Sequence, residues 1–273
     1  MARQRRIKLE RSAYYHIISR VANKAFLLEG SEIKNTIVRM LYRAADFSGI
    51  HVVSYVVMDN HFHLCIEVPD KKDIPKEEVI RRIGILYGDE KKDQVIRHLE
   101  RLEEAGYFLE ANLEIDRYRS RMGDLSEFMK TFKQRLTQWF NMNHHHEGTL
   151  WDGRFKSLLL ENGPAVKAVV GYIHMNPVRA KIVEKAEDYP WSTAGAAVQS
   201  DKEASKGLSL DVADKRWLTR ERKLIQGGIM GSQAFVEELS IHFKDNFHGV
   251  HVSPRPVRLG GSNLYMTHGQ RSA

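Results

Sequence analysis

Two histidines lie one residue apart in the segment "MDNHFHLCIEV" (58–68), which otherwise reads as a buried strand. Because successive side chains of a strand point to opposite faces, His61 and His63 share one face with Cys65 and Glu67. Their backbones are then about 7 Å apart, close enough for two imidazole nitrogens to bend toward one cation. The spacing alone equally allows two half-exposed sheet residues, so a metal site requires a further ligand elsewhere in the chain.

A candidate for that ligand occurs in the segment "AVVGYIHMNPVRA" (168–180), within a helix that we predict over about 164–175 and that ends near Pro177. Tyr172 and Asn176 are four residues apart, so they lie one turn apart on the same helical face. The amide carbonyl of Asn176 suits a hard cation, and the phenol of Tyr172 could attack an electrophile held by that cation.

The elements that must position these residues follow a recognisable order. A strand-like run covers 13–21, a helix runs from Ser31 to a stop at Gly49, and two strands cover 50–57 and 61–68. Strand, helix, strand, strand is half of a split α/β unit with an antiparallel sheet. We therefore predict an α/β (α+β) fold with a ferredoxin-like core and a central antiparallel sheet.

The remaining segments carry the rest of the predicted fold. Residues 70–122 are dense in both charge signs with helical spacing and predict a helical insertion. Asp124 begins a capping-box pattern before a helix whose Lys130 and Lys133 lie off the apolar stripe. A turn around Asp152 and Gly153 then leads into a fourth strand.

The chain beyond about residue 197 is looser in composition. Short helices are predicted around 208–225 and 231–243, followed by a flexible basic tail from Ser253. We therefore divide the chain into a core at 1–196, with its insertion at about 70–122, and a C-terminal extension at 197–273.

Composition limits the classes of partner. The formal net charge of +7 allows a polyanion partner without requiring one. The single cysteine, Cys65, excludes an intrachain disulfide framework and suits a reducing cytoplasm. No apolar run approaches the roughly 18 residues of a membrane helix, so no membrane association is expected.

Four segments carry a resemblance to a known family: "MDNHFHL", "GTLWDGRFKS", "YIHMNPVRA" and "YPWST". Together, in this order over about residues 10–195, they resemble the REP-associated tyrosine transposases. These belong to the HUH (histidine–hydrophobic–histidine) single-strand DNA transposases and endonucleases. His-x-His alone is a weak motif, whereas its combination with the other three segments is specific.

The resemblance implies a site and an activity. His61 and His63 would bind Mg²⁺ or Mn²⁺, Asn176 would complete the protein ligands, and Tyr172 would be the nucleophile. Many relatives in the superfamily have Gln as third ligand, and Asn176 is one methylene shorter. The implied enzyme is a metal-dependent single-strand DNA endonuclease and strand transferase that acts on palindromic REP-type hairpins through a 5′-phosphotyrosine.

Two alternatives from other classes stay open. One is a non-catalytic nucleic-acid-binding module on the same ferredoxin-like fold. The other is a zinc hydrolase that uses Cys65 with the two histidines, although three side chains along one straight strand point in parallel and do not easily converge.

Single-stranded or hairpin DNA is the expected partner of a monomer or homodimer in the bacterial cytoplasm, associated with the nucleoid. Phosphate contacts and base stacking would come from basic and aromatic residues. Trp151 is equally a core candidate, and the N-terminal Arg3, Arg5 and Arg6 would add non-specific grip. The predicted DNA contacts are Lys130, Lys133, Trp151, Arg154, Lys156, Arg255 and Arg258.

Overall fold

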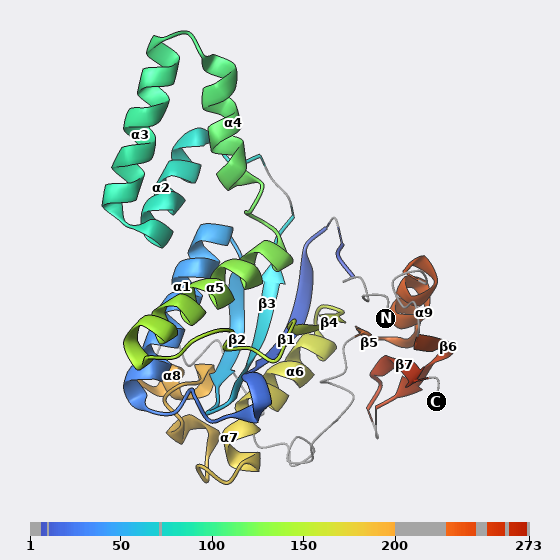
Figure 1. The fold of residues 1–273 in the computed structure, drawn as a ribbon. Coiled ribbons are helices and arrows are strands. Elements are labelled where there is room, and N and C mark those ends of the chain that lie inside the picture. The colour runs from blue at the N-terminus through green and yellow to red at the C-terminus, as the bar shows by residue number, and fades with distance from the viewer. Residues whose placement is uncertain are drawn as a thin grey trace. The chain divides into compact units, whose positions relative to one another are not determined.

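The structure, a computed structural model, describes residues 7–9, 11–70, 73–199, 228–243, 250–259 and 262–271. Its strands form one seven-stranded sheet in the order β2-β3-β1-β4-β5-β7-β6 (Figure 1). The chain divides into two compact units. The first comprises residues 1–34, 53–67 and 151–273, and the second comprises 35–52 and 68–150.

The predicted ferredoxin-like core is confirmed by the order of its elements. Along the chain it runs β1 (Ala13–Arg20), α1 (Ser31–Ser48), β2 (His51–Val57), β3 (His61–Val68), α5 (Leu125–His144) and β4 (Lys156–Leu160). This is the β-α-β-β-α-β arrangement, with the predicted helical insertion between β3 and α5. β1 pairs antiparallel with β4 in a register that joins Tyr14 to Leu160 and Ile18 to Lys156.

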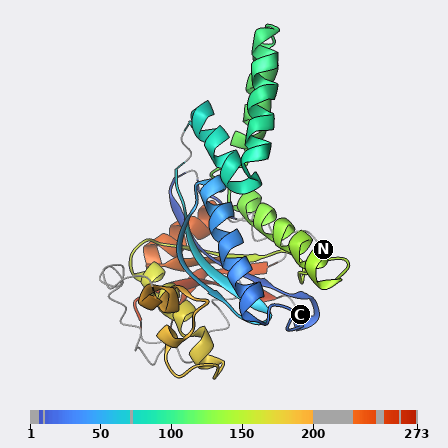
Figure 2. The ribbon, with the colours of Figure 1, turned by 90° about the vertical axis from the view of Figure 1, so that its left-hand side faces the viewer.

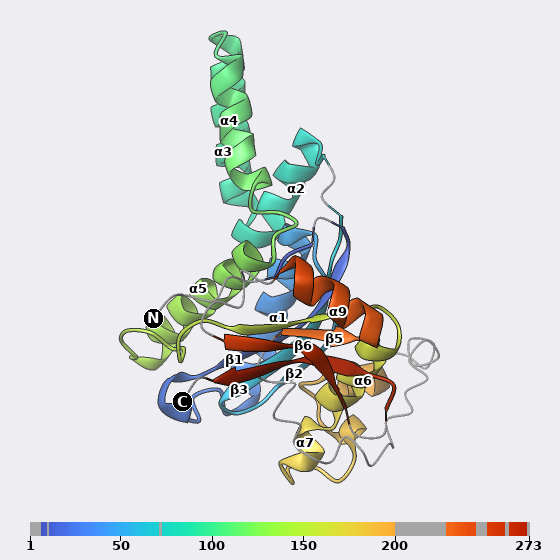
Figure 3. The ribbon, with the colours of Figure 1, turned by 90° about the vertical axis from the view of Figure 1, so that its right-hand side faces the viewer.

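The prediction of a flexible tail from Ser253 is wrong for the residues that form β6 (Val250–Arg258) and β7 (Tyr265–Arg271). β5 (Gly228–Gly231) pairs parallel with β4, and β7 pairs antiparallel with β5. Helix α9 (Gln233–His242), which was predicted, packs along these strands (Figure 3). The predicted helix around 208–225 lies outside the described residues.

Two prolines explain why the strand pair β6–β7 was not predicted from the sequence. Pro254 and Pro256 lack the backbone N–H that a central strand must donate, and this argues against a strand. β6 tolerates them because it is an edge strand, and its register with β7 shifts between Ser253 and Val257. One side of an edge strand has no neighbouring strand, so a proline there removes no hydrogen bond of the sheet.

The second unit contains the predicted insertion as three helices, α2 (Lys76–Tyr87), α3 (Asp89–Glu104) and α4 (Phe108–Arg119). Figures 1 and 2 show α3 and α4 running side by side. One face of each helix is buried in a shared core, as the helical spacing predicted. The fully buried members of this core include Val79, Ile83, Leu86, Leu99 and Phe47.

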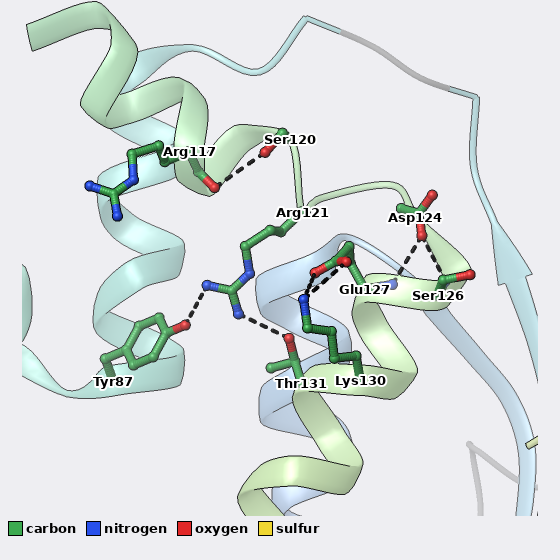
Figure 4. Close-up of polar contacts among 9 residues, drawn as sticks. All are labelled: Tyr87, Arg117, Ser120, Arg121, Asp124, Ser126, Glu127, Lys130 and Thr131. Atoms are coloured by element: carbon green, nitrogen blue, oxygen red, sulfur yellow. Dashed lines mark hydrogen bonds and ion pairs between the residues drawn. The ribbon is translucent and has the colours of Figure 1, made fainter. Parts of the chain in front are cut away.

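The start of α5 is capped by Asp124, as predicted. Its carboxylate accepts hydrogen bonds from the backbone N–H of Ser126 at 2.7 Å and of Glu127 at 3.0 Å (Figure 4). These bonds satisfy two of the N–H groups that a helix start leaves without intrahelical partners.

Arg121 ties the insertion to α5 within the second unit. Its guanidinium donates to the hydroxyl of Tyr87 at 2.7 Å and to the hydroxyl of Thr131 at 2.9 Å (Figure 4). The same group lies 5.1 Å from the ring centroid of Phe47, within the range of a cation–π contact. Charge, hydrogen bonds and ring contact thus all fix the segment that leads out of α4.

The "YPWST" segment of the first unit has a structural role around a buried lysine. The side chain of Lys34 forms an ion pair with Asp59 at 2.6 Å and donates to the hydroxyl of Tyr189 at 2.9 Å. It also lies 4.6 Å from the ring of Trp191. Burial opposes the charge, but the bonds to Asp59 and Tyr189 outweigh it and raise the pKa of Lys34. The hydroxyl of Tyr189 in turn donates to the backbone carbonyl of Val57 at 2.7 Å.

This cluster holds the turn between β2 and β3, from which His61 follows, and it is tested by Asp59→Asn. The variant leaves the Lys34 charge in place, with its side chain only 7% exposed, and removes the opposite charge. We expect the free energy of unfolding to fall by about 3 kcal/mol, the low end for a broken buried pair, because Asp59 is partly exposed. Urea denaturation measures it, and Asp89→Asn, which breaks an exposed i,i+3 pair with Lys92, is the control and should change little. Equal stability of the two variants would contradict the structural role.

The other short elements are α8 (Thr193–Gln199) and two 3₁₀ turns at Ala22–Lys24 and Ala186–Asp188. In the part of the chain that the structure describes, none of the helices combines the length and apolarity that crossing a bilayer requires.

Candidate metal and nucleophile site

The two faces of β3 are both covered. Phe62, on one face, is fully buried, as predicted for the core side. The face with His63 and Cys65, expected to be polar, is also largely closed, since these side chains are 2% and 0% exposed. Cys65 belongs to the core cluster that α6 forms against the sheet. The histidine face is therefore an interior surface between the sheet and a helix, with His61 half-buried at one end.

The covering helix is α6 (Pro164–His174), followed by the single turn α7 (Asn176–Arg179). It begins with Gly163 at a φ of 88° and Pro164 in its first turn, a sequence order that favours a sharp helix start. Tyr172 and Asn176 are 2% and 8% exposed, so both side chains of the predicted pair point inward.

Three histidine rings and the phenol of Tyr172 form one aromatic group. The ring centroids of His61 and His63 are 5.1 Å apart. His16, on the neighbouring strand β1, stacks on His63 at 5.2 Å and 14°. The ring of Tyr172 meets both edge-on, with centroids 5.7 Å from His63 and 5.9 Å from His16. The nucleophile and the two metal-ligand candidates predicted from sequence are thus brought together.

His16 was missed by the sequence reasoning. Its Nε2 lies 2.9 Å from Nδ1 of His63, and the side chain is 1% exposed. The signal that could have found it is topological, because a ferredoxin-like sheet places β1 beside β3.

Arg179 is a second residue that sequence reasoning missed. The carbon of its guanidinium lies 4.0 Å from the ring centroid of Tyr172, and Nη2 donates to the backbone carbonyl of Tyr172 at 3.0 Å. A fixed positive charge over a phenol favours the phenolate, the form that attacks an electrophile.

The donor chemistry fits a divalent cation. The amide nitrogen of Asn176 donates to the carbonyls of Tyr172 at 3.1 Å and Ile173 at 3.3 Å, which leaves its oxygen as the acceptor. Burial, followed by the charges of His61, His16, Arg179 and Arg20, lowers the pKa of His63 well below its usual value. A neutral imidazole is the form that binds metal.

A site built from His, Cys, Asp and Glu alone is not present within the described ranges, where no group of three such residues is arranged to hold a metal ion. Burial raises the pKa of Cys65 to about 12, so without a metal ion its thiol is neutral. Because a coordinating metal ion itself deprotonates a thiol, the zinc alternative stays a prediction that the zinc content of the purified protein would test.

The predicted DNA contacts of the first unit differ in accessibility. Arg154, just before β4, and Lys156, the first residue of β4, are both exposed. Trp151 is 6% exposed, and its ring meets that of Phe62 edge-on at 5.5 Å, which is the packing expected of a core residue. Arg154 and Lys156 are therefore the accessible candidates in this segment.

The remaining basic candidates are spread over both units. In the second unit Lys130 is exposed and pairs with Glu127 at 3.3 Å, while Lys133 is half-buried (Figure 4 shows the Lys130 pair). In the first unit Arg258 is exposed and donates to the backbone carbonyl of Ser262 at 2.6 Å. Arg255 lies in β6 with its side chain outside the description, and the N-terminal arginines at positions 3, 5 and 6 lie outside the described residues.

The first half of this site lies in a segment that matches a protein family. Residues 10–98 match the family model described as "Transposase IS200 like". The match covers His16, His61 and His63 and ends within α3, before Tyr172 and Asn176. Over this third of the chain, which contains the "MDNHFHL" segment, it confirms the predicted resemblance to a transposase family.

Two solved structures are similar to the chain at 16% identity. One is a REP-associated tyrosine transposase bound to a REP hairpin, with a TM-score of 0.47 over 73% of this chain and 87% of the other. The second is a Deinococcus radiodurans R1 protein provisionally described as a transposase, with a TM-score of 0.30 over 62% and 92%. No curated protein sequence matches the chain.

Proposed function

We propose that this protein is a metal-dependent single-strand DNA endonuclease and strand transferase of the tyrosine-transposase type, acting on palindromic hairpin DNA. The observation that carries the proposal is the contact of the Tyr172 ring with His63 at 5.7 Å, one helical turn before Asn176. A phenol beside two imidazoles, with an amide oxygen four residues further along the chain, supplies the groups that attack on a metal-held phosphodiester needs.

Each side chain then has a task. His61, His63 and the amide oxygen of Asn176 would hold Mg²⁺ or Mn²⁺, which when bound neutralises the phosphate oxygens as a Lewis acid. The phenol oxygen of Tyr172 loses its proton and bonds to phosphorus, while the bond from phosphorus to the 3′-oxygen breaks and that oxygen takes up a proton. The products are a 5′-phosphotyrosine and a free 3′-hydroxyl. Because the phosphoester energy is kept, the reverse reaction can join another end.

Access to the phenol requires movement, because Tyr172 is only 2% exposed. Arg179 lies over its ring and is half-buried, so a DNA strand that approaches the phenol would contact Arg179. A guanidinium that turns from the ring to a phosphate oxygen would gain a charge-assisted hydrogen bond and uncover the nucleophile. Arg179 would thereby favour the phenolate before the strand enters and hold the scissile phosphate afterwards.

The direct test is to incubate the full chain with end-labelled single-stranded hairpin DNA and Mg²⁺ or Mn²⁺ and to separate the products on a denaturing protein gel. A labelled species that runs with the protein is the expected phosphotyrosine adduct. DNA binding without any adduct or cleavage would instead establish the non-catalytic binding module.

Substrate form provides a separate prediction. Hairpins with an open single-stranded flank should be bound and cleaved, and pairing of the flank should weaken both, because one tyrosine buried against a sheet needs a flexible strand. Exposed basic residues such as Arg154 and Lys156 would contact the phosphates of the duplex stem, so binding should weaken steeply with salt. Discrimination against a scrambled flank would come from base-edge contacts, about 1–3 kcal/mol for each good bidentate pair.

Gel-shift and cleavage assays on open, paired and scrambled flanks measure this preference at two salt concentrations. Equal cleavage of all three substrates would leave a metal-dependent nuclease and remove the case for guided hairpin recognition.

A further inference from the structure

An asparagine beside the histidine pair controls which nitrogen of His61 carries a proton. The amide nitrogen of Asn60 lies 3.1 Å from the backbone carbonyl of Lys24, which can only accept a hydrogen bond. The amide oxygen of Asn60 must therefore be the atom that lies 2.7 Å from Nδ1 of His61. Since that oxygen can only accept, Nδ1 of His61 carries the hydrogen, and the lone pair of the neutral ring is on Nε2.

A similar outer contact exists at His63, whose Nδ1 lies 2.9 Å from Nε2 of His16. Two neutral imidazoles can share this hydrogen in either direction. If Nδ1 of His63 donates, its Nε2 carries the lone pair, as in His61, and the hydrogen of the neutral His16 ring is on its buried Nδ1. If Nε2 of His16 donates instead, the hydrogen of His63 is on Nε2 and that nitrogen cannot bind a cation.

Only the first direction makes both histidines of β3 ligands through the same ring nitrogen. His61 and His63 project from the same face of β3, with ring centroids 5.1 Å apart. In this direction each ring donates a hydrogen bond from Nδ1, His61 to Asn60 and His63 to His16, and the lone pair of each ring is on Nε2. Metal-bound histidines usually donate their other N–H to such a partner, which fixes the tautomer and the ring orientation.

We propose that Asn60 and His16 are positioning residues that hold His61 and His63 in the Nδ1–H tautomer, so that Nε2 of each is the metal-ligating nitrogen. The inference rests on the proposed function for the identity of the ligand, but the tautomers themselves are a property of the metal-free protein. It assigns His16 a task that the strand pattern of β1 alone does not reveal.

The tautomers are measured without metal or DNA. Long-range ¹H–¹⁵N correlation spectra of the full chain, labelled on histidine nitrogen and treated with chelator, separate the protonated from the bare ring nitrogen of each histidine. We expect Nδ1–H for both His61 and His63. A hydrogen on Nε2 of either ring would overturn the assignment for that residue and its partner.

Variants of His16 separate positioning from packing. His16→Leu fills a similar volume but cannot accept a hydrogen bond, so His63 should lose its single tautomer and Mn²⁺ affinity should fall about 10- to 100-fold. His16→Gln places a side-chain oxygen near the former Nε2, so it should keep the tautomer and bind Mn²⁺ within a few-fold of the unaltered protein. Mn²⁺ binding is followed by the loss of the free-ion electron paramagnetic resonance signal.

His174→Leu is the matched control. His174 is also a buried imidazole. Its Nε2 lies 3.0 Å from the hydroxyl of Ser54, so this hydrogen bond does not involve His61 or His63. This variant should keep the Mn²⁺ affinity, and thermal denaturation verifies that each variant is folded. Equal tautomers and equal Mn²⁺ affinity in His16→Leu and the unaltered protein would refute the role of His16.

Failure of the two proposals looks different. If the unaltered protein binds no Mn²⁺ but shows Nδ1–H on both rings, the metal-dependent function fails, while the tautomers assigned to His61 and His63 stand. If Mn²⁺ binds while His63 carries its hydrogen on Nε2 in the metal-free protein, the function stands and the positioning inference fails.

Discussion

Tyr172→Phe should abolish the covalent adduct with hairpin DNA and lower strand cleavage by on the order of 10⁴-fold or more, as expected when a nucleophile is removed. Phenylalanine keeps the ring that meets His63 and His16 edge-on and that lies under Arg179. Only the hydroxyl is lost, so the core around α6 keeps its shape. The measurement is the yield of labelled adduct and cleaved strand at saturating DNA and metal.

Two controls make this result specific. DNA binding and the melting temperature of Tyr172→Phe should stay close to those of the unaltered protein, which excludes misfolding. Tyr15→Phe removes the hydroxyl of another buried tyrosine, 2% exposed and on β1, and it should form the adduct normally. An adduct that persists in Tyr172→Phe would show that another residue is the nucleophile.

The fold was predictable where a segment determines its own structure. β1 and β3 alternate, Asp124 caps α5, and Pro164 follows a glycine at the start of α6. The β6–β7 pair was not predictable, because a strand that contains two prolines forms only as the edge of a sheet that the rest of the chain builds. Its formation depends on β5 and β4, which are distant in sequence.

The candidate site divides in the same way. His61 and His63, and likewise Tyr172 and Asn176, are close in sequence, so the period of a strand or helix places each pair on one face. His16 joins the site because β1 lies beside β3 in the sheet, and Arg179 because its side chain reaches from α7 to the Tyr172 ring. The closed face at Cys65 reflects the packing of α6 across β3, which alternation within β3 cannot reveal.

Removal of the metal should stop cleavage as completely as removal of the nucleophile. EDTA acts on the unaltered sequence, and re-addition of Mn²⁺ or Mg²⁺ should restore the adduct. His61→Ala should reproduce the loss, by at least about 100-fold, because a neutral phenol is a poor nucleophile toward a negatively charged phosphodiester without a Lewis acid. His61 is the preferred position, since it is half-buried, whereas alanine at the buried His63 would also remove its stacking on His16.

The control for the histidine change is His98→Ala, an exposed histidine on α3 that should leave cleavage unaltered. Hairpin binding should survive both EDTA and His61→Ala, because phosphate contacts from exposed basic residues do not need the ion. This separation matters, since a loss of binding together with cleavage would point to a metal that organises the fold rather than the reaction. Cleavage that continues undiminished in EDTA would rule out the site built on His61, His63 and Asn176, and Tyr172 would then need its activation from Arg179 alone.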